Sequence, residues 1–245
     1  VWGGSATLSQ LEERPWVRKV CEPLWDKSLV FRHYWQKYVM PHLARKSCDL
    51  LFVPGGSVPG DPGPFVTMCR NMLPFEARER QRYGISLMRL KLVLMRQSQI
   101  NTFKRARGII FLNKYAQQVI CENLKDLKAE QIIIPHGINP SFINAPRIAK
   151  PLGSYSYKRP FKWIFVSTID LYKHQWQVVE AVALLRKQGF PVSLDLIGGA
   201  YLSAQRKLES VISRVDPKSD FIHYLKKVPY EQLPAHYQNA DAGVF

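Results

Sequence analysis

Short runs of apolar residues recur along the chain from about residue 49, and each is followed by a Gly, Asn or Pro turn and then by a stretch of helical character. The first four runs lie at residues 50–53, 65–68, 108–112 and 131–134. Apolar residues follow one another in these runs instead of alternating with polar ones, so we expect strands with both faces buried. Strands of this kind, separated by helices, predict a parallel sheet covered by helices.

Two helices are expected between these strands, a long one at residues 76–107 and another at 114–128. Apolar residues of the long helix recur at the spacing of a single buried face. They are Tyr83, Leu87, Leu90 and Leu94. The first 48 residues, whose tryptophans lie in a mixed apolar and charged setting, are also predicted to be helical.

A change of composition divides the chain, because residues 139–160 are rich in Pro, Gly, Ser and Tyr, as connectors are. The strand and helix pattern then resumes, with strands predicted at 163–166, 192–197 and 221–224, helices at 173–188, 202–215 and 230–239, and a last strand from Ala242. We therefore expect a first domain at residues 1–145, a linker at 146–160 and a second domain at 161–245. Together they predict an α/β fold of two Rossmann-like domains with parallel sheets that face each other across a cleft.

Ligands of open parallel sheets bind beyond the carboxyl ends of the strands, so the residues that follow each run are the candidates for a site. Gly55 and Gly56 follow the first run, and they predict either a loop that approaches an anion with its backbone or simply a tight turn. Arg70 and Asn71 follow the second run and bring a cation and an amide to the end of a strand.

In the second domain the most informative candidate is Lys173, which is expected to open a helix. A cation there opposes the helix dipole, so we interpret it as a phosphate-binding group that acts with the free N–H groups of the first turn. A solvated lysine is the alternative. Gly198 and Gly199 follow the next strand, and Val228 lies in the loop after the strand at 221–224, where backbone groups could meet a nucleobase. No GxGxxG fingerprint accompanies these glycines, and a charged surface loop remains the alternative around Val228.

Four segments, taken in order, resemble the motifs of the retaining GT-B glycosyltransferases of the group-1 (GT4) type. They are Ile-Ile-Ile-Pro-His-Gly-Ile-Asn at 132–139, Phe-Val-Ser-Thr-Ile at 165–169 with Lys-His-Gln at 173–175, Leu-Asp-Leu-Ile-Gly-Gly at 194–199, and the Val-Pro to Ala-Asp stretch at 228–241. The family's first motif has Asn where this chain has His136, and its second motif reads hVGRh and then KG. The resemblance runs from about Asp49 to the last residue.

The resemblance implies transfer of a sugar from a nucleotide-diphosphate donor with retention of configuration and without a metal or another cofactor. It implies that Lys173 binds the donor diphosphate, while Thr168 stands where the family has an arginine, so that Arg70 is a candidate for the second cation. Gly55, Gly56, Arg70 and Asn71 would line the acceptor side, and Gly198, Gly199 and Val228 would meet the nucleotide. The family's acidic pair would follow Phe245, so the catalytic residues stay unknown.

The chain begins with Val1 and ends within a rising apolar run, so we expect a fragment that lacks both ends and is inactive alone. Another enzyme with a GT-B-like fold, such as a sugar-nucleotide epimerase, remains an alternative. Outside the enzymes, a basic nucleic-acid-binding or scaffold protein is the alternative.

The charge of the chain adds a question about partners, since 35 Lys and Arg against 19 Asp and Glu give a net charge of +16. Much of the excess lies between Arg70 and Arg107, where few aromatic residues interleave with the cations, and this disfavours nucleic acid. An anionic membrane surface that contacts the segment from Arg78 to Arg107 and a merely solvated basic face both remain open. A lipid-linked or envelope glycan acceptor would agree with the membrane surface.

The cysteines and histidines predict neither disulfides nor a metal site. The four cysteines lie far apart without a CxxC pair, which is typical of reduced thiols in a cytoplasm, and no His or Cys cluster has the spacing of metal ligands. The sequence contains no run of about 18 apolar residues that could span a bilayer. We therefore expect a cytoplasmic protein without a metal, and a peripheral position at the inner face of the cell membrane remains open.

Overall fold

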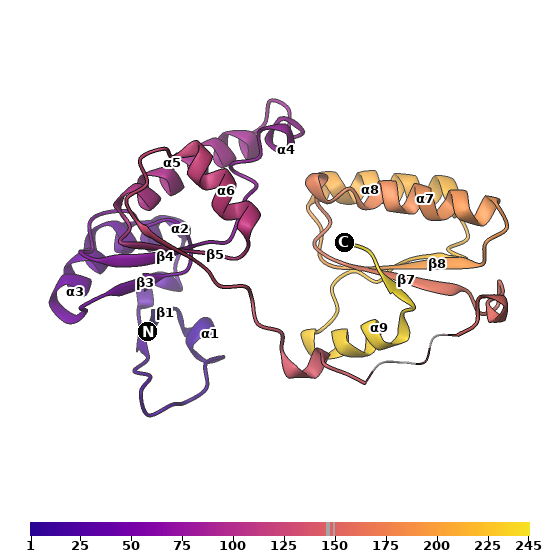
Figure 1. Cartoon of the computed structure of the whole chain (residues 1–245), viewed down its shortest axis with the longest axis horizontal. Helices are drawn as coiled ribbons and strands as arrows, with labels where there is room; N and C mark the ends of the chain where they lie inside the picture. The colour runs from indigo at the N-terminus through magenta and orange to yellow at the C-terminus, as the bar shows by residue number, and fades with distance from the viewer. Residues whose placement is uncertain (146–147, 149) are drawn as a thin grey trace. The chain divides into compact units, whose positions relative to one another are not determined.

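The computed structural model describes residues 1–145, 148 and 150–245, and these divide into two compact units, Val1–His136 and Gly137–Phe245 (Figure 1). The predicted linker at 146–160 falls in the second unit, and its residues Pro146, Arg147 and Ala149 lie outside the described residues. Each unit is built around a parallel sheet with helices, which confirms the predicted α/β fold class. The cleft between the two sheets stays a prediction.

The sheet of the first unit has the order β3-β4-β5-β6, and all of its strands are parallel. Its strands are β3 (Leu51–Val53), β4 (Phe65–Cys69), β5 (Gly108–Phe111) and β6 (Glu130–Ile133). The four predicted strands are thus confirmed to within a residue or so at each end. Helix α6 (Lys114–Asn123) begins where it was expected and ends earlier, near Leu124.

The segment before this sheet is only partly helical. Helices α1 (Ser5–Leu8), α2 (Leu29–Tyr34) and α3 (Met40–Ser47) alternate with the strands β1 (Trp2–Gly3) and β2 (Val20–Cys21), which pair in parallel. The prediction of helix throughout was therefore wrong. Trp35, only 1% exposed, holds this segment to the core, because its ring packs edge-on against Trp2 at 6.3 Å and Trp25 at 5.3 Å.

Only one face of the first sheet is buried, so the expectation of two buried faces was wrong for this unit. Along β4 the side chains alternate between buried Phe65, Thr67 and Cys69 and half-buried neighbours. On the opposite face Phe52 is 52% exposed and Ile132 is 55% exposed. A continuous apolar run shows that both faces of a strand can be buried. Whether both are buried depends on where the helices pack.

The predicted long helix is two helices, α4 (Ala77–Gln81) and α5 (Leu87–Arg105). Gly84 lies between them with a φ of +55°, a left-handed conformation that ends a helix, and the Ser86 hydroxyl then caps α5 by accepting from the Arg89 N–H at 3.3 Å.

The predicted buried face of that helix was also wrong, because Leu87, Leu90 and Leu94 are 86%, 55% and 62% exposed. The buried side chains of α5 are Leu92, Gln99, Thr102 and Phe103. Leu92, Gln99 and Phe103 have the same helical spacing as the predicted set, so the period alone could not decide which side faces the sheet.

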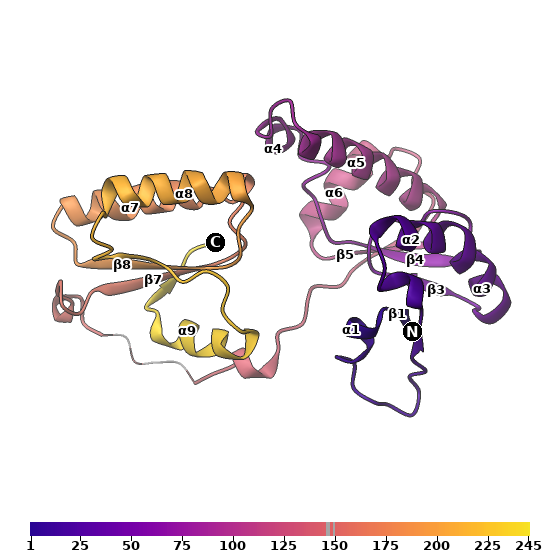
Figure 2. The same cartoon turned by 180° about the vertical axis from the view of Figure 1, so that it is seen from behind.

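The second unit has the strand order β10-β7-β8-β9, again all parallel. Its strands are β7 (Phe161–Val166), β8 (Val192–Ile197), β9 (Ile222–Tyr224) and β10 (Ala242–Gly243). Helices α7 (Gln175–Lys187) and α8 (Leu202–Val215) cover one face, and α9 (Leu233–Asn239) lies on the other, as the two opposite views show (Figures 1 and 2). Every residue of the central strand β8 is buried, which confirms the prediction of two covered faces for that strand.

A row of charged side chains crosses three neighbouring strands of this sheet. The Asp195 carboxylate lies 2.9 Å from Nδ1 of His223 and 3.6 Å from Nζ of Lys162. The hydrogen bond to Asp195 raises the pKa of His223, although burial opposes this. Burial alone would raise the pKa of Asp195, but the His223 hydrogen bond and the Lys162 charge hold it below its usual value.

These shifts predict a pH dependence of stability. The contribution of protonated His223 is fully present below the ordinary histidine pKa of about 6.5 and is lost as the pH rises through the raised value. We therefore expect His223→Gln to lower the melting temperature more at pH 5.5 than at pH 8.5. Thermal unfolding at the two pH values measures this, with His33→Gln at an exposed position as the control. An equal loss at both pH values would contradict the prediction.

Candidate functional site

The order of strands in the second unit marks one position for a ligand. The chain passes from β7 outward to β8 and β9, and then returns to place β10 on the other side of β7. In open α/β sheets, ligands bind beyond the carboxyl ends of the strands where the order reverses in this way. The site is therefore expected beyond Val166 and Gly243, the last residues of β7 and β10.

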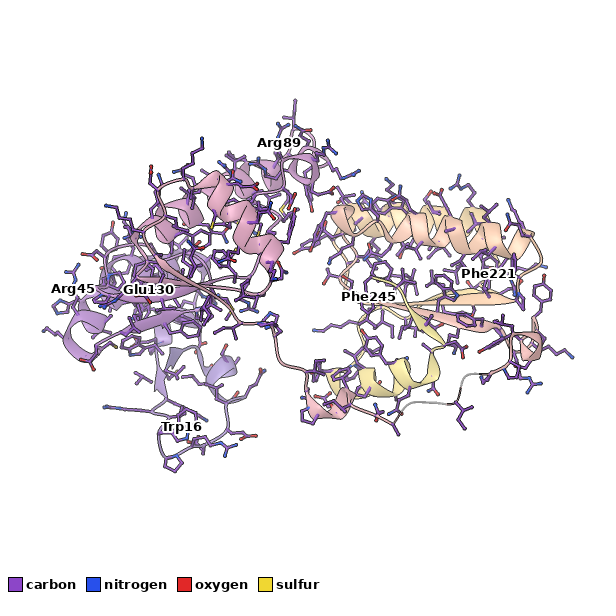
Figure 3. All side chains as sticks on the ribbon, viewed as in Figure 1. Trp16, Arg45, Arg89, Glu130, Phe221 and Phe245 are labelled. Carbon is purple, nitrogen blue, oxygen red and sulfur yellow. The ribbon has the colours of Figure 1, made fainter. Side chains whose placement is uncertain are left out.

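A pocket of about 650 Å³ lies at this position, and all of its walls come from the second unit. Aromatic and aliphatic side chains of β7, of α7 and of the two residues after β10 form most of its lining, together with polar groups from the connection between β7 and α7. The lining residues are Trp163, Phe165, Val166, Ser167, Tyr172, Lys173, His174, Gln177, Val178, Ala181, Val244 and Phe245. Figure 3 shows Phe245, labelled, among the side chains over this sheet. The predicted phosphate-binding residue Lys173 is thus a wall of the pocket at the reversal of strand order.

Lys173 does not open the helix as predicted. It is the last residue of the 3₁₀ turn Leu171–Lys173, and α7 begins at Gln175. The turn is capped by Asp170, which is 5% exposed and whose carboxylate accepts from the Leu171 N–H at 2.6 Å. This turn places the exposed Lys173 just before the first turn of α7, with its Nζ 5.1 Å from the Tyr172 ring. Burial, with the nearby Asp170, raises the pKa of Tyr172, as expected for a sparsely hydrated wall.

His174 joins the turn to α7 in a conformation that favours glycine. Its φ is +58°, and a non-glycine residue there is strained unless its surroundings hold it. The imidazole packs edge-on against Trp176, with 5.7 Å between ring centroids. The position aligns with the Gly of the KG motif, so the motif comparison carried a signal for this backbone conformation that the residue type did not.

Gln175 was missed by the sequence analysis. It is fully buried, and its Nε2 donates to the carbonyl oxygen of Thr168 at 2.9 Å. This bond fixes the backbone of Thr168, which the sequence analysis placed at the phosphate of the sugar donor. The Thr168 side chain itself is exposed. A polar residue in the first turn of a buried helix was the available signal, because such a residue needs a hydrogen-bond partner.

Gly198 brings the loops after β7 and β8 into direct contact. Its φ is +152°, and a Cβ at this position would lie 2.0 Å from the Ser167 carbonyl oxygen. Its N–H donates to the Lys226 carbonyl at 2.8 Å, and its own carbonyl accepts from the Tyr224 hydroxyl at 3.1 Å. Gly198 therefore joins the loops after β7, β8 and β9 through its backbone. The sequence analysis predicted a contact with a nucleotide for Gly198 and did not predict this structural role.

The remaining residues predicted for the donor side lie at the same edge of the sheet. The Gly199 carbonyl accepts from the Ile169 N–H at 2.8 Å, and space is open where a Cβ would stand. Val228 is half-buried in the loop that follows β9. The structure thus gathers Thr168, Lys173, Gly198, Gly199 and Val228 beyond the carboxyl ends of neighbouring strands, while their contact with a nucleotide stays a prediction.

The predicted acceptor-side residues lie together at the carboxyl ends of β3 and β4 in the first unit. Gly56 is buried with a φ of +71°, and a Cβ there would come within 3.2 Å of Gln99 and of the Met68 carbonyl. Asn71 accepts from the Leu73 N–H at 3.0 Å and so shapes its own turn. Arg70 and Gly55 are exposed.

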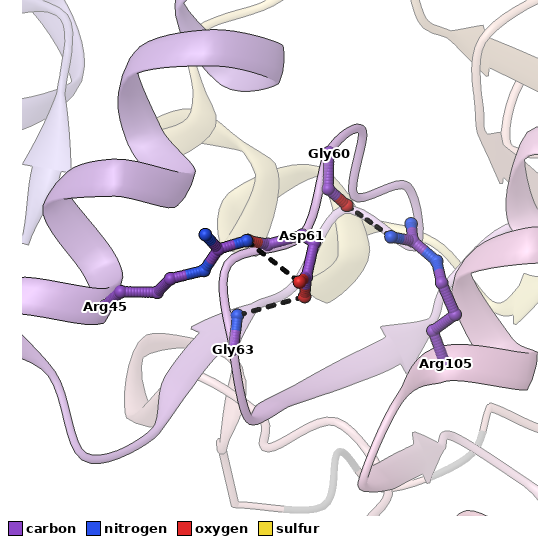
Figure 4. A network of polar contacts seen from close by, with 5 residues as sticks. All are labelled: Arg45, Gly60, Asp61, Gly63 and Arg105. Atoms are coloured by element: carbon purple, nitrogen blue, oxygen red, sulfur yellow. Dashed lines mark hydrogen bonds and ion pairs between the residues drawn. The ribbon is translucent and has the colours of Figure 1, made fainter.

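Two arginines hold the loop that follows Gly55 and Gly56 (Figure 4). Arg45 of α3 pairs with the Asp61 carboxylate at 2.8 Å, which also accepts from the Gly63 N–H at 3.3 Å. Arg105 of α5 donates to the carbonyl oxygens of Gly60 and Val58. The loop is therefore tied to both helices, and Arg105, which the charge count had assigned to a basic face, has a structural role.

The part of the chain that the structure describes holds no group of three or more His, Cys, Asp or Glu residues able to bind a metal. Its cysteines are unpaired, and burial raises the pKa of the Cys69 thiol to about 11. Among the same described residues, no helix has the length and apolar character needed to cross a bilayer.

Comparison with known proteins finds likeness in structure but not in sequence. No family profile matches the chain, and no curated protein matches it. Sucrose-phosphate synthase from Thermosynechococcus elongatus is similar over 95% of this chain and 60% of its own, with a TM-score of 0.61 and 13% identity. HepE of Anabaena in complex with UDP matches over 84% of this chain and 55% of its own, with a TM-score of 0.53 and 15% identity. A trehalose-6-phosphate protein of E. coli bound to UDP-2-fluoroglucose matches at a TM-score of 0.51 and 13% identity.

These structures are GT-B glycosyltransferases, and the likeness shows that this chain has the Rossmann-like GT-B fold. The chain spans less than two thirds of the length of these proteins. Their identity to it is too low to show more than the fold.

The contact of Gly198 with Ser167 predicts a difference between adjacent glycines. Gly198→Ala is expected to destabilise the second unit by at least about 2 kcal/mol, because a backbone oxygen must move to admit the Cβ. Gly199→Ala, where the space is open, is expected to change stability much less. Urea unfolding of both variants measures the difference in the free energy of unfolding. Equal losses of stability in the two variants would show that the loops after β7 and β8 can separate freely.

The two carbonyl contacts of Arg105 predict that it stabilises the loop after β3. Arg105→Met is expected to reduce the free energy of unfolding by about 1–2 kcal/mol, because the Gly60 and Val58 carbonyls lose a charged donor. Limited proteolysis should then cut the loop at 54–64 faster. Lys104→Met, at the exposed neighbouring position, serves as the control. Unchanged proteolysis of the Arg105 variant would contradict the role.

Proposed function

We propose that this chain is part of a retaining glycosyltransferase of the group-1 (GT4) type, which moves a sugar from a nucleotide-diphosphate donor to an acceptor. The observation that carries the proposal is the pocket at the strand-order reversal of the second unit, with Lys173 in its wall. The GT-B fold supports it, since HepE and the E. coli trehalose-6-phosphate protein carry UDP or a UDP-sugar in their structures.

The donor diphosphate would bind between Lys173 and the first turn of α7. The 13 residues of α7 direct their dipole and the N–H groups of that first turn toward this end of the pocket. The ammonium of Lys173 adds a full positive charge just outside the same turn. Charge that develops on the leaving diphosphate would be stabilised by these groups and by the Thr168 hydroxyl, so the chemistry needs no metal or other cofactor.

The nucleoside would extend along the edge of the sheet toward Gly199 and Val228. There Gly198 keeps the β7 and β8 loops in contact, so the floor under the nucleoside would be built from backbone. The residues proposed for the acceptor side are Gly55, Gly56, Arg70 and Asn71 of the other unit. The catalytic residues stay unassigned.

The acceptor class that best suits a basic first unit is a glycan or a lipid-linked acceptor at an anionic surface. We place the protein in the cytoplasm, peripheral at the inner face of the cell membrane. The wide spacing of the four cysteines, without a CxxC pair, supports this proposal.

Titration with nucleotides tests the pocket. We expect UDP or GDP to bind the chain, and Lys173→Ala to weaken that binding about tenfold or more, because a charged hydrogen bond to phosphate contributes about 1.5–3 kcal/mol. Uridine or guanosine, which lacks the diphosphate, should bind both proteins equally. Isothermal titration calorimetry supplies the affinities.

The matched control is Lys187→Ala, which removes an exposed lysine from the other end of the same helix. It should leave nucleotide affinity unchanged. Equal affinity of the wild-type and Lys173→Ala proteins would remove Lys173 from the site. Absence of any nucleotide binding by the wild-type chain at millimolar concentration would contradict the donor pocket itself.

A further inference from the structure

An exposed apolar surface interrupts the charged exterior of the first unit at the start of α5. It comprises Ile85, Leu87, Leu90 and Leu94, and we call it the leucine patch. Ile85 is 104% exposed and Leu87 is 86% exposed, so these side chains project fully into solvent. A shallow groove of about 390 Å³ runs along the patch, between the leucines and Ser57.

The core of the first unit does not need these side chains. Apart from Leu92, which is 1% exposed, the buried side chains of α5 lie toward its other end, at Gln99, Thr102 and Phe103. None of the four patch residues belongs to the buried cluster. Single exposed apolar residues are ordinary, but several side by side on one helix mark a surface that binds something apolar.

The cations in the segment around the patch outnumber the acidic residues that could neutralise them. The segment from α4 to the middle of α5 carries Arg78, Arg80, Arg82, Arg89, Lys91 and Arg96 against Glu76 and Glu79. Glu79 accepts from Arg82 at 2.8 Å, and Glu76 accepts from the Tyr115 hydroxyl.

The arginines also crowd one another. Burial lowers the pKa of Arg80, and the positive charges of Arg96 and Arg89 lower it further. A positive field of this kind is relieved by an anionic partner. Arg89, labelled in Figure 3, lies in the first turn of α5, between Leu87 and Leu90 in the sequence.

We infer that the leucine patch and the cations around it form a surface that docks on an anionic lipid bilayer. Leu87, Leu90 and Leu94 would enter the boundary between headgroups and acyl chains, while the cations of α4 and the first half of α5 would meet lipid phosphates. The inference goes beyond nucleotide binding and does not depend on Lys173.

The structure narrows this surface to part of the basic segment. Arg105 is engaged with the loop at Val58 and Gly60, and the last turns of α5 pack on the core, so the surface ends near Arg96. Nucleic acid would gain nothing from aliphatic side chains that project fully, whereas acyl chains would bury them.

Flotation of the full chain with lipid vesicles tests the inference. Wild-type protein is expected to float with vesicles of phosphatidylcholine and phosphatidylglycerol at 7:3 and to bind pure phosphatidylcholine at least tenfold more weakly. Millimolar glycerol phosphate, which offers the headgroup anion without acyl chains, should leave the flotation largely unchanged.

Two sets of variants separate insertion from charge. Leu87→Ser, Leu90→Ser and Leu94→Ser combined should lower vesicle affinity at least tenfold, while Leu184→Ser, at an exposed apolar position of α7, should not. Arg89→Gln with Lys91→Gln should lower it about fivefold for each charge, following the roughly 1 kcal/mol per cation near an anionic surface. Lys128→Gln with Lys187→Gln, which removes the same charge elsewhere, should have a smaller effect.

Circular dichroism of each variant shows whether it is folded, and unchanged spectra are expected because the altered side chains lie outside the core. Full vesicle binding by a folded triple-leucine variant would overturn the insertion and leave only adsorption by charge. Failure of the wild-type chain to bind anionic vesicles at 50 mM salt, or its displacement by glycerol phosphate, would overturn the inference altogether. None of these results depends on nucleotide affinity, so the donor pocket is tested separately.

Discussion

Parallel pairing is the constraint on which the rest of this structure depends. It places the carboxyl ends of all strands of a sheet on one edge, so that loops far apart in the sequence meet there. In the second unit the loops after β7, β8 and β9 converge and are joined through Gly198, whose N–H and carbonyl bond to Lys226 and Tyr224. A larger residue at Gly198 would collide with the Ser167 carbonyl, so this contact holds the loops of the pocket together.

The same constraint explains why the reversal of strand order matters chemically. Where β10 returns to the other side of β7, a pocket lined by side chains lies beyond the carboxyl ends of the two strands. The turn at Asp170 to Lys173 and the left-handed His174 then bring an ammonium and a helix N-terminus to that space. The proposed phosphate site therefore follows from topology and from one local turn together.

The first unit shows how charge and packing divide a helix between two roles. The last turns of α5 bury Thr102 and Phe103, and Arg105 ties down the loop beside Gly60. The first turns expose leucines and arginines that the core does not use. The net charge of the chain therefore has no single explanation, because some cations are structural and others remain available to a partner.

The sequence predicted the position of those candidate-site residues that follow the ends of strands. Lys173, Gly198, Gly199 and Val228 were chosen because a residue after a parallel strand reaches the ligand edge, and Thr168 because it stands where the resembled family has an arginine. The structure places all five at that edge. Gln175 was missed because its importance comes from a hydrogen bond to the Thr168 carbonyl, which only the folded loop creates. The predicted start of α7 at Lys173 was wrong because the Asp170 cap closes a 3₁₀ turn first.

The sequence by itself determined the elements whose signal is local. Strand β8 and helix α8 lie at the predicted residues, because a run of apolar residues and a helical period depend only on neighbours along the chain. The tertiary structure alone decided which faces those elements bury. Phe52 and Leu87 belong to patterns that predict burial, yet both are exposed, because burial depends on which segment packs against them. Contacts between distant segments decide that, and no local pattern contains them.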